Sequence, residues 1–173
     1  IAQEGRLNYQ DPQSKGFLVY GLSKEGYHHR IQRSEYFYVV EIEKKVQGFL
    51  MCYDKLTLAS LIEERHLNHE DGIVDFLLRQ KEDFVFGDQI AVVDECRRKG
   101  VGEKLLGRCF LDMKINVMLA MYVGVLHQPV MNKYSRKFCI SQGFEEVCEV
   151  ENSDKSVWGM YEILLNFTQS QRK

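Results

Sequence analysis

The residues whose types and spacing most clearly indicate a ligand-binding role form a short basic turn that also contains two glycines. The turn reads Arg97-Arg98-Lys99-Gly100-Val101-Gly102. A helical pattern follows it, and the first amides of a helix lack intrahelical partners and favour negative charge. Glycines let a ligand approach the backbone where a Cβ would collide. The turn therefore predicts a cradle for a phosphate or pyrophosphate.

A predicted strand and a predicted helix position this turn. Phe84–Val93 is rich in β-branched and aromatic residues, as strands are. From Glu103 onward the apolar residues fall on one helical face; they are Leu105, Leu106, Cys109, Phe110 and Met113. Two better-known phosphate loops are excluded. The turn has neither the Gly-Lys-Ser/Thr ending of a P-loop nor the three-glycine spacing of a dinucleotide turn.

Two motifs resemble those of the GNAT N-acetyltransferase superfamily. The acyl-CoA motif of that family has Arg or Gln, then Gly three residues later, then Gly or Ala two residues after that. Arg97, Gly100 and Gly102 fill these positions. The C-terminal motif of the family is matched by the run from residue 132 to residue 144, at Asn132, Ser135, Phe138, Gly143 and Phe144. The family's usual Tyr falls on Cys139.

The resemblance implies an α/β (α+β) fold, with residues 1–173 forming a single GNAT domain. Its central mixed, strongly twisted sheet would have six to seven strands flanked by helices, splayed between the fourth and fifth strands. Acetyl-CoA would lie in the split, with its pyrophosphate on the glycine turn and its pantetheine arm along the motif strand. The residues expected to bind it are Ala91, Val92, Val93, Arg97, Arg98, Lys99, Gly100, Val101, Gly102, Glu103, Lys104, Asn132, Ser135 and Phe138.

Other elements follow from local patterns. Before the motif we expect a strand at 15–20, a helix at 22–33 capped by Ser23, and a hairpin of strands at 36–42 and 46–53. Residues 55–83 contain two helical patterns, at 56–67 and 73–80, and we interpret them as a substrate-side insertion. After the motif we expect a buried strand at 117–125 parallel to the motif strand, a helix from Asn132 to Gly143, and a final pair of strands at 144–150 and 157–165.

The implied reaction is direct transfer of the acetyl group of acetyl-CoA to a primary amine of a small molecule or peptide. It needs a base for the ammonium proton, an oxyanion donor and an acid for the thiolate. Asp88 on the motif strand, His127 five residues before Asn132, and Glu41 are the candidate bases; Asp88 is equally consistent with a structural bond to a loop. Cys139 is either the acid or a small packing residue.

No metal is expected. Residues 63–71 contain Glu63, Glu64, Glu70 and Asp71, with His66 and His69 between them, and we interpret this segment as a solvated acidic surface in preference to a metal site. His28 and His29 are adjacent on the predicted helix, so they point in different directions. We interpret them as a surface pair.

Composition sets the outer bounds. The 173 residues are 45% hydrophobic and 28% charged with a net charge of −2, which does not favour nucleic-acid binding. We expect no membrane span and see no signal peptide, although the chain starts at Ile1. Five cysteines without a C-x-x-C pair indicate reduced thiols and a cytoplasmic location. Monomer and homodimer stay open, as do an inactive acyl-CoA sensor and a protein-interaction domain.

Overall fold

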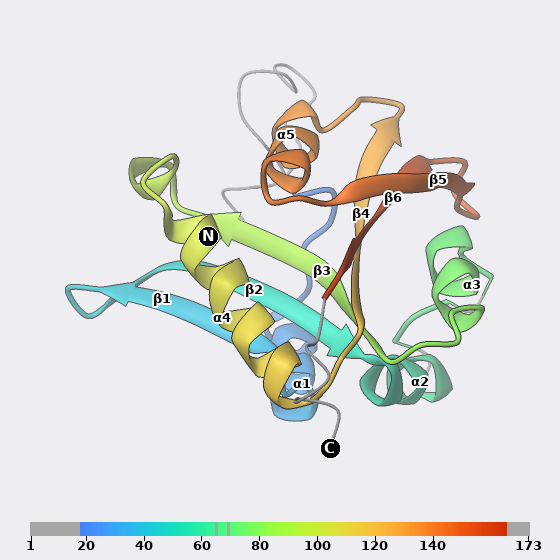
Figure 1. The fold of residues 1–173 in the computed structure, drawn as a ribbon, viewed down its shortest axis with the longest axis horizontal. Helices are drawn as coiled ribbons and strands as arrows, with labels where there is room; N and C mark the ends of the chain where they lie inside the picture. Colours follow the sequence, from blue (N-terminus) through green and yellow to red (C-terminus); the bar gives the residue numbers. More distant parts are fainter. Residues whose placement is uncertain (1–17, 65, 69, 166–173) are drawn as a thin grey trace.

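The computed structural model describes residues 18–64, 66–68 and 70–165, which form a mixed sheet flanked by helices (Figure 1). The sheet has six strands in the order β1-β2-β3-β4-β6-β5. They are β1 (Phe37–Ile42), β2 (Lys45–Asp54), β3 (Phe84–Val92), β4 (Ala120–Gln128), β5 (Glu145–Glu151) and β6 (Val157–Leu164). Among the described strands only β3 and β4 run parallel, and the helix between them makes the crossover.

Side-chain caps begin most of the longer helices. The helices are α1 (Lys24–Arg33), α2 (Lys55–Glu63), α3 (Gly72–Leu78), α4 (Val101–Ile115) and α5 (Lys133–Ser141), with a 3-10 turn at Asp94–Cys96. Ser23 accepts a hydrogen bond from the amide of Gly26, and Asn132 from the amide of Ser135, which confirms both predicted caps. The helix α4 is different, because Gly100 at its N-cap offers no side chain.

Each face of the sheet carries its own apolar cluster. On one face, α4 and α5 contribute buried residues such as Leu105, Cys109 and Cys139, which pack against Val85 and Tyr161 of the sheet. The other face is covered by α1, α2 and α3, and its buried residues include Leu58, Leu61, Leu77, Phe84, Tyr122 and Met160. In Figure 1, α4 crosses in front of the sheet, and α2 and α3 lie at its lower right.

The sheet splits between its two parallel strands. β3 and β4 pair only from Phe84 opposite Ala120 to Gly87 opposite Val123, and they then separate (Figure 1). A Cβ on Gly87 would lie 2.8 Å from Met121 Cε, so glycine lets the last pair of the ladder close. The fourth and fifth expected strands, at 84–93 and 117–125, correspond to β3 and β4. This split therefore confirms the splay expected from the family resemblance.

A bulge in β3 lies at the point of separation. Cys52 of β2 pairs with Gly87 while Met51 pairs with Gln89, so Asp88 is the extra residue. Before the bulge Phe86 belongs to the cluster under α2, and after it Ile90 belongs to the cluster under α4. The bulge therefore turns Asp88 and Gln89 toward the same face of the sheet, the face that α1 covers.

The inserted helices are fastened to the far end of the sheet. Ser153 Oγ donates to Asp71 Oδ1 at 2.7 Å, and the amide of Ile73 donates to Asn152 Oδ1 at 3.2 Å. Gly72 lies against the carbonyl group of Glu151. The α2–α3 segment thus bridges from β2 to the β5–β6 turn across one face of the sheet.

Most expected elements are confirmed, with shifted ends. The expected strand at 15–20 is not formed where it can be seen: residues 15–17 lie outside the described residues, and Leu18 makes only an isolated bridge. The helix expected to reach residue 67 ends at Glu63, and the strand expected from residue 117 begins at Ala120. Val117 has a positive φ of 59°, and its amide donates to the carbonyl of Lys114 at the end of α4, so the chain turns there before β4 begins.

Among the described residues, no helix combines the length and apolar character needed to cross a membrane. All five cysteines are free thiols.

Candidate active site

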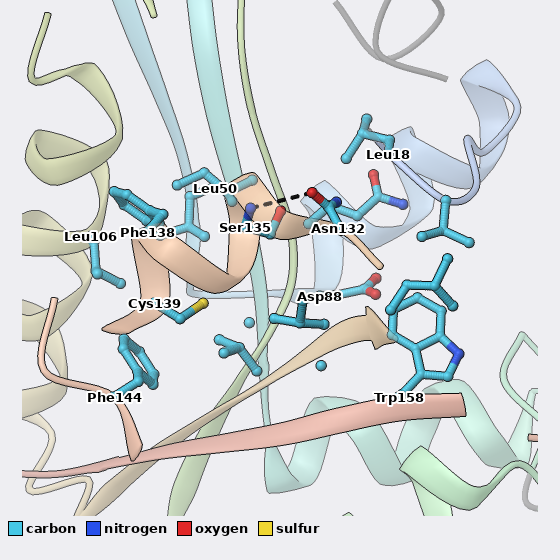
Figure 2. Close-up of a pocket in the computed structure, with 18 of the residues that line it drawn as sticks. Leu18, Leu50, Asp88, Leu106, Asn132, Ser135, Phe138, Cys139, Phe144 and Trp158 are labelled. Atoms are coloured by element: carbon cyan, nitrogen blue, oxygen red, sulfur yellow. Dashed lines mark hydrogen bonds between the residues drawn. The ribbon is translucent and has the colours of Figure 1, made fainter. Parts of the chain in front are cut away.

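A pocket occupies the split between β3 and β4 and reaches both faces of the sheet (Figure 2). On the side of α4 and α5 its walls are Leu50, Leu106, Val125, Phe138, Cys139 and Phe144. On the opposite side its walls are Leu18, Val19, Tyr20, Asp88, Gln89, Gly124 and Trp158. A ligand entering from the α4 side can therefore meet a second ligand that enters from the other face.

The N-terminus of α4 is built as an anion site. Gly100 adopts the left-handed conformation at φ 78°, which favours glycine, and leaves the first turn without a side-chain cap. The amides of the following three residues therefore have no intrahelical acceptor. Arg98 and Lys99 are exposed beside them. This is the cradle geometry that the sequence predicted.

Arg97 has a different place from its two basic neighbours. Its Nε lies 3.1 Å from the carbonyl oxygen of Val92 and 3.1 Å from Asp94 Oδ1. The side chain therefore folds back and fixes the turn that leads from β3 into α4. Of the three adjacent cations, Arg98 and Lys99 are the ones displayed toward solvent.

The two motifs meet at Gly102. A Cβ on Gly102 would lie 3.2 Å from Cζ of Phe138, whose ring comes from α5. Asn132, Ser135 and Phe138 all line the pocket, and the side chain of Asn132 caps α5 (Figure 2). The other expected cofactor residues lie along β3 beyond the split or on the turn and the first turn of α4.

Beyond the split, one edge of β3 has no neighbouring strand in the described part of the chain. Val92 pairs with Gly48 of β2 on one edge, while the register with β4 ends at Gly87. A Cβ on Gly48 would lie 3.0 Å from the carbonyl oxygen of Ala91, so glycine permits this close pairing. The opposite edge of residues 91–93 faces the pocket side, where the family resemblance places the pantetheine arm.

Asp88 is the charged group of the pocket. Tyr53 donates to its Oδ2 at 2.7 Å, and Tyr20 donates to its Oδ1. Burial raises the pKa of Asp88 above its usual range, and the two hydroxyl bonds and the nearby Arg30 oppose that rise. The carboxylate is half-buried in the pocket wall, and its pKa lies above that of an exposed aspartate.

A buried arginine lies behind Asp88. Arg30 is 4% exposed, and its Nε donates to the hydroxyl of Tyr53 at 2.9 Å. Its other nitrogens donate to the carbonyls of Gly26 and His66. No carboxylate within the described ranges forms an ion pair with it, so Asp88, reached through Tyr53, is its compensating charge.

Cys139 also lines the pocket, from α5. Burial raises the pKa of its thiol to about 12. A free cysteine has a pKa of about 8.5, so burial makes Cys139 a poorer proton donor than an exposed thiol. The site therefore brings Asp88 and Cys139 into one pocket but disfavours proton donation by Cys139.

His127 is not among the residues that line the pocket. It is the extra residue of a bulge in β4, its Nδ1 lies 2.6 Å from Glu149 Oε1, and its Nε2 lies 3.2 Å from the hydroxyl of Tyr161. Its ring covers Gly159. These contacts tie β4 to β6 and the edge strand β5. Glu41 is exposed near the β1–β2 turn and does not line the pocket either.

Among the described residues, two groups of side chains have ligand atoms close enough for a metal, and an arginine lies beside each of them. One comprises His29, Glu64 and His66, and the other His127, Glu146 and Glu149. Arg33 lies 2.6 Å from Glu64 in the first, and Arg136 lies 3.4 Å from Glu146 in the second. The arginines supply the counter-charge that a cation would otherwise provide.

Of the histidines considered at the sequence level, His28 is exposed and His29 pairs with Glu64, so the two do point apart. His69 lies outside the described residues.

The fold and pocket define a class: an α/β fold whose sheet opens beside an uncapped helix N-terminus. The Acetyltransferase (GNAT) family model matches residues 9–120, and the chain belongs to this family. No curated protein sequence matches the chain.

Solved structures share the fold at low sequence identity. Ard1 from Thermoplasma volcanium has a TM-score of 0.64 and 16% identity over 87% of this chain and 84% of its own. An agmatine N-acetyltransferase variant has a TM-score of 0.62 and 9% identity over 84% and 82%. Arabidopsis thaliana Naa50, in complex with the bisubstrate analogue CoA-Ac-MVNAL, has a TM-score of 0.57 and 16% identity over 87% and 85%.

Sequence reasoning missed the partners of Asp88 and one wall of the pocket. Tyr20 and Tyr53 lie 68 and 35 residues from Asp88 along the chain, and no spacing rule connects them. Trp158, the only Trp in the sequence, was a usable signal, because Trp side chains are enriched at interfaces that are apolar on one side and wet on the other.

Proposed function

We propose that the protein is an N-acetyltransferase that transfers the acetyl group of acetyl-CoA directly to a primary amine of a small molecule or peptide. The observation that carries the proposal is the single pocket through the sheet, which joins the α4 side of the split to Asp88 on the other face. Acetyl-CoA would enter along β3 with its pyrophosphate on the α4 amides. The amine would approach from the side of Asp88.

Asp88 is our choice of base. The attacking amine must lose a proton, and a positioned carboxylate can accept it directly or through one water. Asp88 lies in the pocket, whereas His127 and Glu41 do not. Its raised pKa makes it a stronger base than an exposed aspartate, and the hydroxyls of Tyr20 and Tyr53 hold the carboxylate in one orientation.

The leaving thiolate needs no strong acid. Backbone amides on the open edge of β3 would stabilise the oxyanion, as oxyanion holes do. Thiols are acidic enough, at about 8.5 for a free cysteine, for a thiolate to depart unprotonated and take its proton from solvent. We therefore assign Cys139 to packing. An acyl-CoA sensor without catalysis gains no support from Asp88, because a binding module needs no desolvated carboxylate at the far end of its pocket.

The acceptor amine should be weakly basic. At pH 7 the free-base form costs about 4.6 kcal/mol for a lysine-like amine and about 1–1.4 kcal/mol for an α-amino group. One carboxylate held by two hydroxyls is a modest base. It therefore favours an acceptor with an α-amino group over one with a lysine-like amine. One structural neighbour is in complex with the bisubstrate analogue CoA-Ac-MVNAL and another is an agmatine N-acetyltransferase. The fold therefore does not determine the basicity of the acceptor amine, and the residues of the site must do so.

The test is release of free thiol from acetyl-CoA in the presence of a panel of amines, with the acetylated product identified by mass. Amine-dependent release supports the proposal. Binding of acetyl-CoA without release for any amine would instead favour the sensor. Absence of acetyl-CoA binding would exclude both.

A further inference from the structure

Charge within the pocket narrows the class of acceptor beyond the reaction type. Asp88 is the only formally charged side chain among the described residues that line the pocket. The remaining walls on its side are apolar or neutral, and include Leu18, Val19, Leu126 and Trp158. An acceptor therefore meets one negative charge and apolar surface.

Two arginines in elements around the pocket, Arg30 of α1 and Arg136 of α5, are already engaged. The nitrogens of Arg30 donate to Tyr53, Gly26 and His66, and Arg30 stands behind Tyr53 instead of lining the pocket. Arg136 donates to Tyr161 and lies against Glu146, also outside the lining. Neither is placed to bind an anionic group of the acceptor.

The apolar wall is fixed in position. The indole Nε1 of Trp158 donates to Ser156 Oγ at 2.8 Å. Gly124 lies beside the ring, since a Cβ there would be 3.4 Å from its Cε3. The ring can therefore cover an apolar chain that extends from an amine at Asp88, without first losing the freedom of an unanchored side chain.

We infer that the acceptor is a primary amine on an apolar chain, with no carboxylate next to the amine and no second cation. This inference rests on the proposed function. A free amino acid would place its carboxylate a few ångströms from Asp88, and the described lining residues offer no cation to compensate it, which is costly in a pocket shielded from water. A diamine would bring a second cation, and Asp88 is the only negative charge among the described lining residues to compensate the two.

The experiment compares leucine, leucinamide and isopentylamine at pH 9, and n-butylamine with putrescine. If amine basicity alone decided kcat/KM, leucine would be the better acceptor than isopentylamine, because its amine is less basic and a larger fraction of it is unprotonated. We expect the reverse, with kcat/KM for leucine lower on the order of 30-fold or more, because its carboxylate is left unpaired beside Asp88. Putrescine should be poorer than n-butylamine.

A leucine-headed pentapeptide amide distinguishes the source of the amine. A kcat/KM well above that of leucinamide, whose α-amino group is about equally basic, assigns a peptide N-terminus, and equal values assign a small weakly basic amine on an apolar chain. Both outcomes support the inference, since both acceptors lack an adjacent carboxylate.

A pair of variants tests the charge argument itself. Val19→Arg places a cation at the pocket, and Val19→Gln is its neutral control of similar length. The ratio of kcat/KM for leucine to that for isopentylamine should rise about 10-fold in Val19→Arg only. The inference would be overturned if the unmodified protein acetylated leucine as well as isopentylamine, or putrescine as well as n-butylamine. The proposed function would then still stand. Lack of transfer to every amine would overturn the proposed function itself.

Discussion

At the scale of single residues, Asp88 combines three properties that a base needs: access to the pocket, a raised pKa and a fixed orientation. A base works in its ionised form, so kcat/KM should rise with pH as Asp88 loses its proton. Because burial raises this pKa, the acid limb should lie above the usual carboxyl value of about 3.9.

The first prediction concerns this limb. Tyr53→Phe removes a hydrogen bond to the charged form of Asp88, so the pKa rises and the acid limb moves to higher pH. Asp88→Asn should lower kcat/KM by about 10²–10⁴ with little change in acetyl-CoA affinity. The measurement is the pH profile of kcat/KM with one acceptor.

Tyr38→Phe is the matched control, because it removes a tyrosine bond to Asp112 outside the pocket. Its profile should match that of the unmodified protein. An unchanged acid limb in Tyr53→Phe together with an active Asp88→Asn would remove Asp88 from the mechanism.

The second prediction concerns Cys139. Burial raises the pKa of its thiol to about 12, well above the value of about 8.5 for a free cysteine, so Cys139 is a poor proton donor at neutral pH. Cys139→Ala should therefore keep turnover within a few-fold, while losing about 1 kcal/mol of unfolding free energy from a smaller core. Cys148→Ala on β5 is the control. A loss of 100-fold in turnover with normal acetyl-CoA affinity would restore the acid role.

Residue roles were only partly predictable from the sequence. The motif placed Asp88 and Cys139 correctly on β3 and α5, because they lie within continuous segments. Whether either reaches the pocket depends on a bulge and on burial, which local patterns do not encode. His127 matched a position in the chain, but its bonds to Glu149 and Tyr161 arise from a hairpin formed later in the sequence.

At the scale of elements, the unit from β3 to α4 was the most predictable part of the chain. Strand composition, the glycine turn and helical periodicity all indicated the same structure there. A segment can be predicted from sequence when its local propensity, apolar pattern and turn residues agree. The bulge at Asp88 was not predictable, since one extra residue in a strand leaves the alternation nearly unchanged. It is nevertheless the feature that directs Asp88 and Gln89 to the acceptor side.

The third prediction separates the roles of the basic residues in the α4 turn. Arg98→Ala should weaken acetyl-CoA binding by about 1.5–3 kcal/mol if its charged side chain bonds a phosphate. Arg97→Ala, unlike Arg98→Ala, should lower thermal stability, because Arg97 bonds Val92 and Asp94 within the turn. Titration calorimetry and thermal unfolding measure the two effects.

Two further variants frame that result. Gly102→Val should weaken binding, because its side chain would meet the ring of Phe138 and cover the helix amides. Arg108→Ala, two turns along the same helix, breaks only an exposed pair with Asp112 and should bind acetyl-CoA normally. Normal binding by both Arg98→Ala and Gly102→Val would exclude the cradle.

At the scale of the whole molecule, the insertion of residues 55–83 joins distant parts of the sheet. It leaves β2, crosses one face and docks on the β5–β6 turn, while Ile73 contacts the neighbourhood of Gly124 in the pocket wall. The sequence predicted two helices here but not their docking site, because the contacts join residues about 80 positions apart. We propose that the docked insertion shapes the acceptor side of the pocket.

The fourth prediction tests this docking. Gly72→Ala would press a methyl group against the carbonyl group of Glu151, so it should cost about 1–3 kcal/mol of unfolding free energy. It should also raise KM for the acceptor while leaving acetyl-CoA affinity unchanged, because the α4 cradle lies on the opposite face of the sheet. Gly107→Ala is the control: its Cβ would contact nothing within 4 Å, and an alanine within α4 should add up to about 1 kcal/mol. If Gly72→Ala weakened acetyl-CoA as much as it raised KM for the acceptor, the insertion would support the whole fold instead of one side of the site.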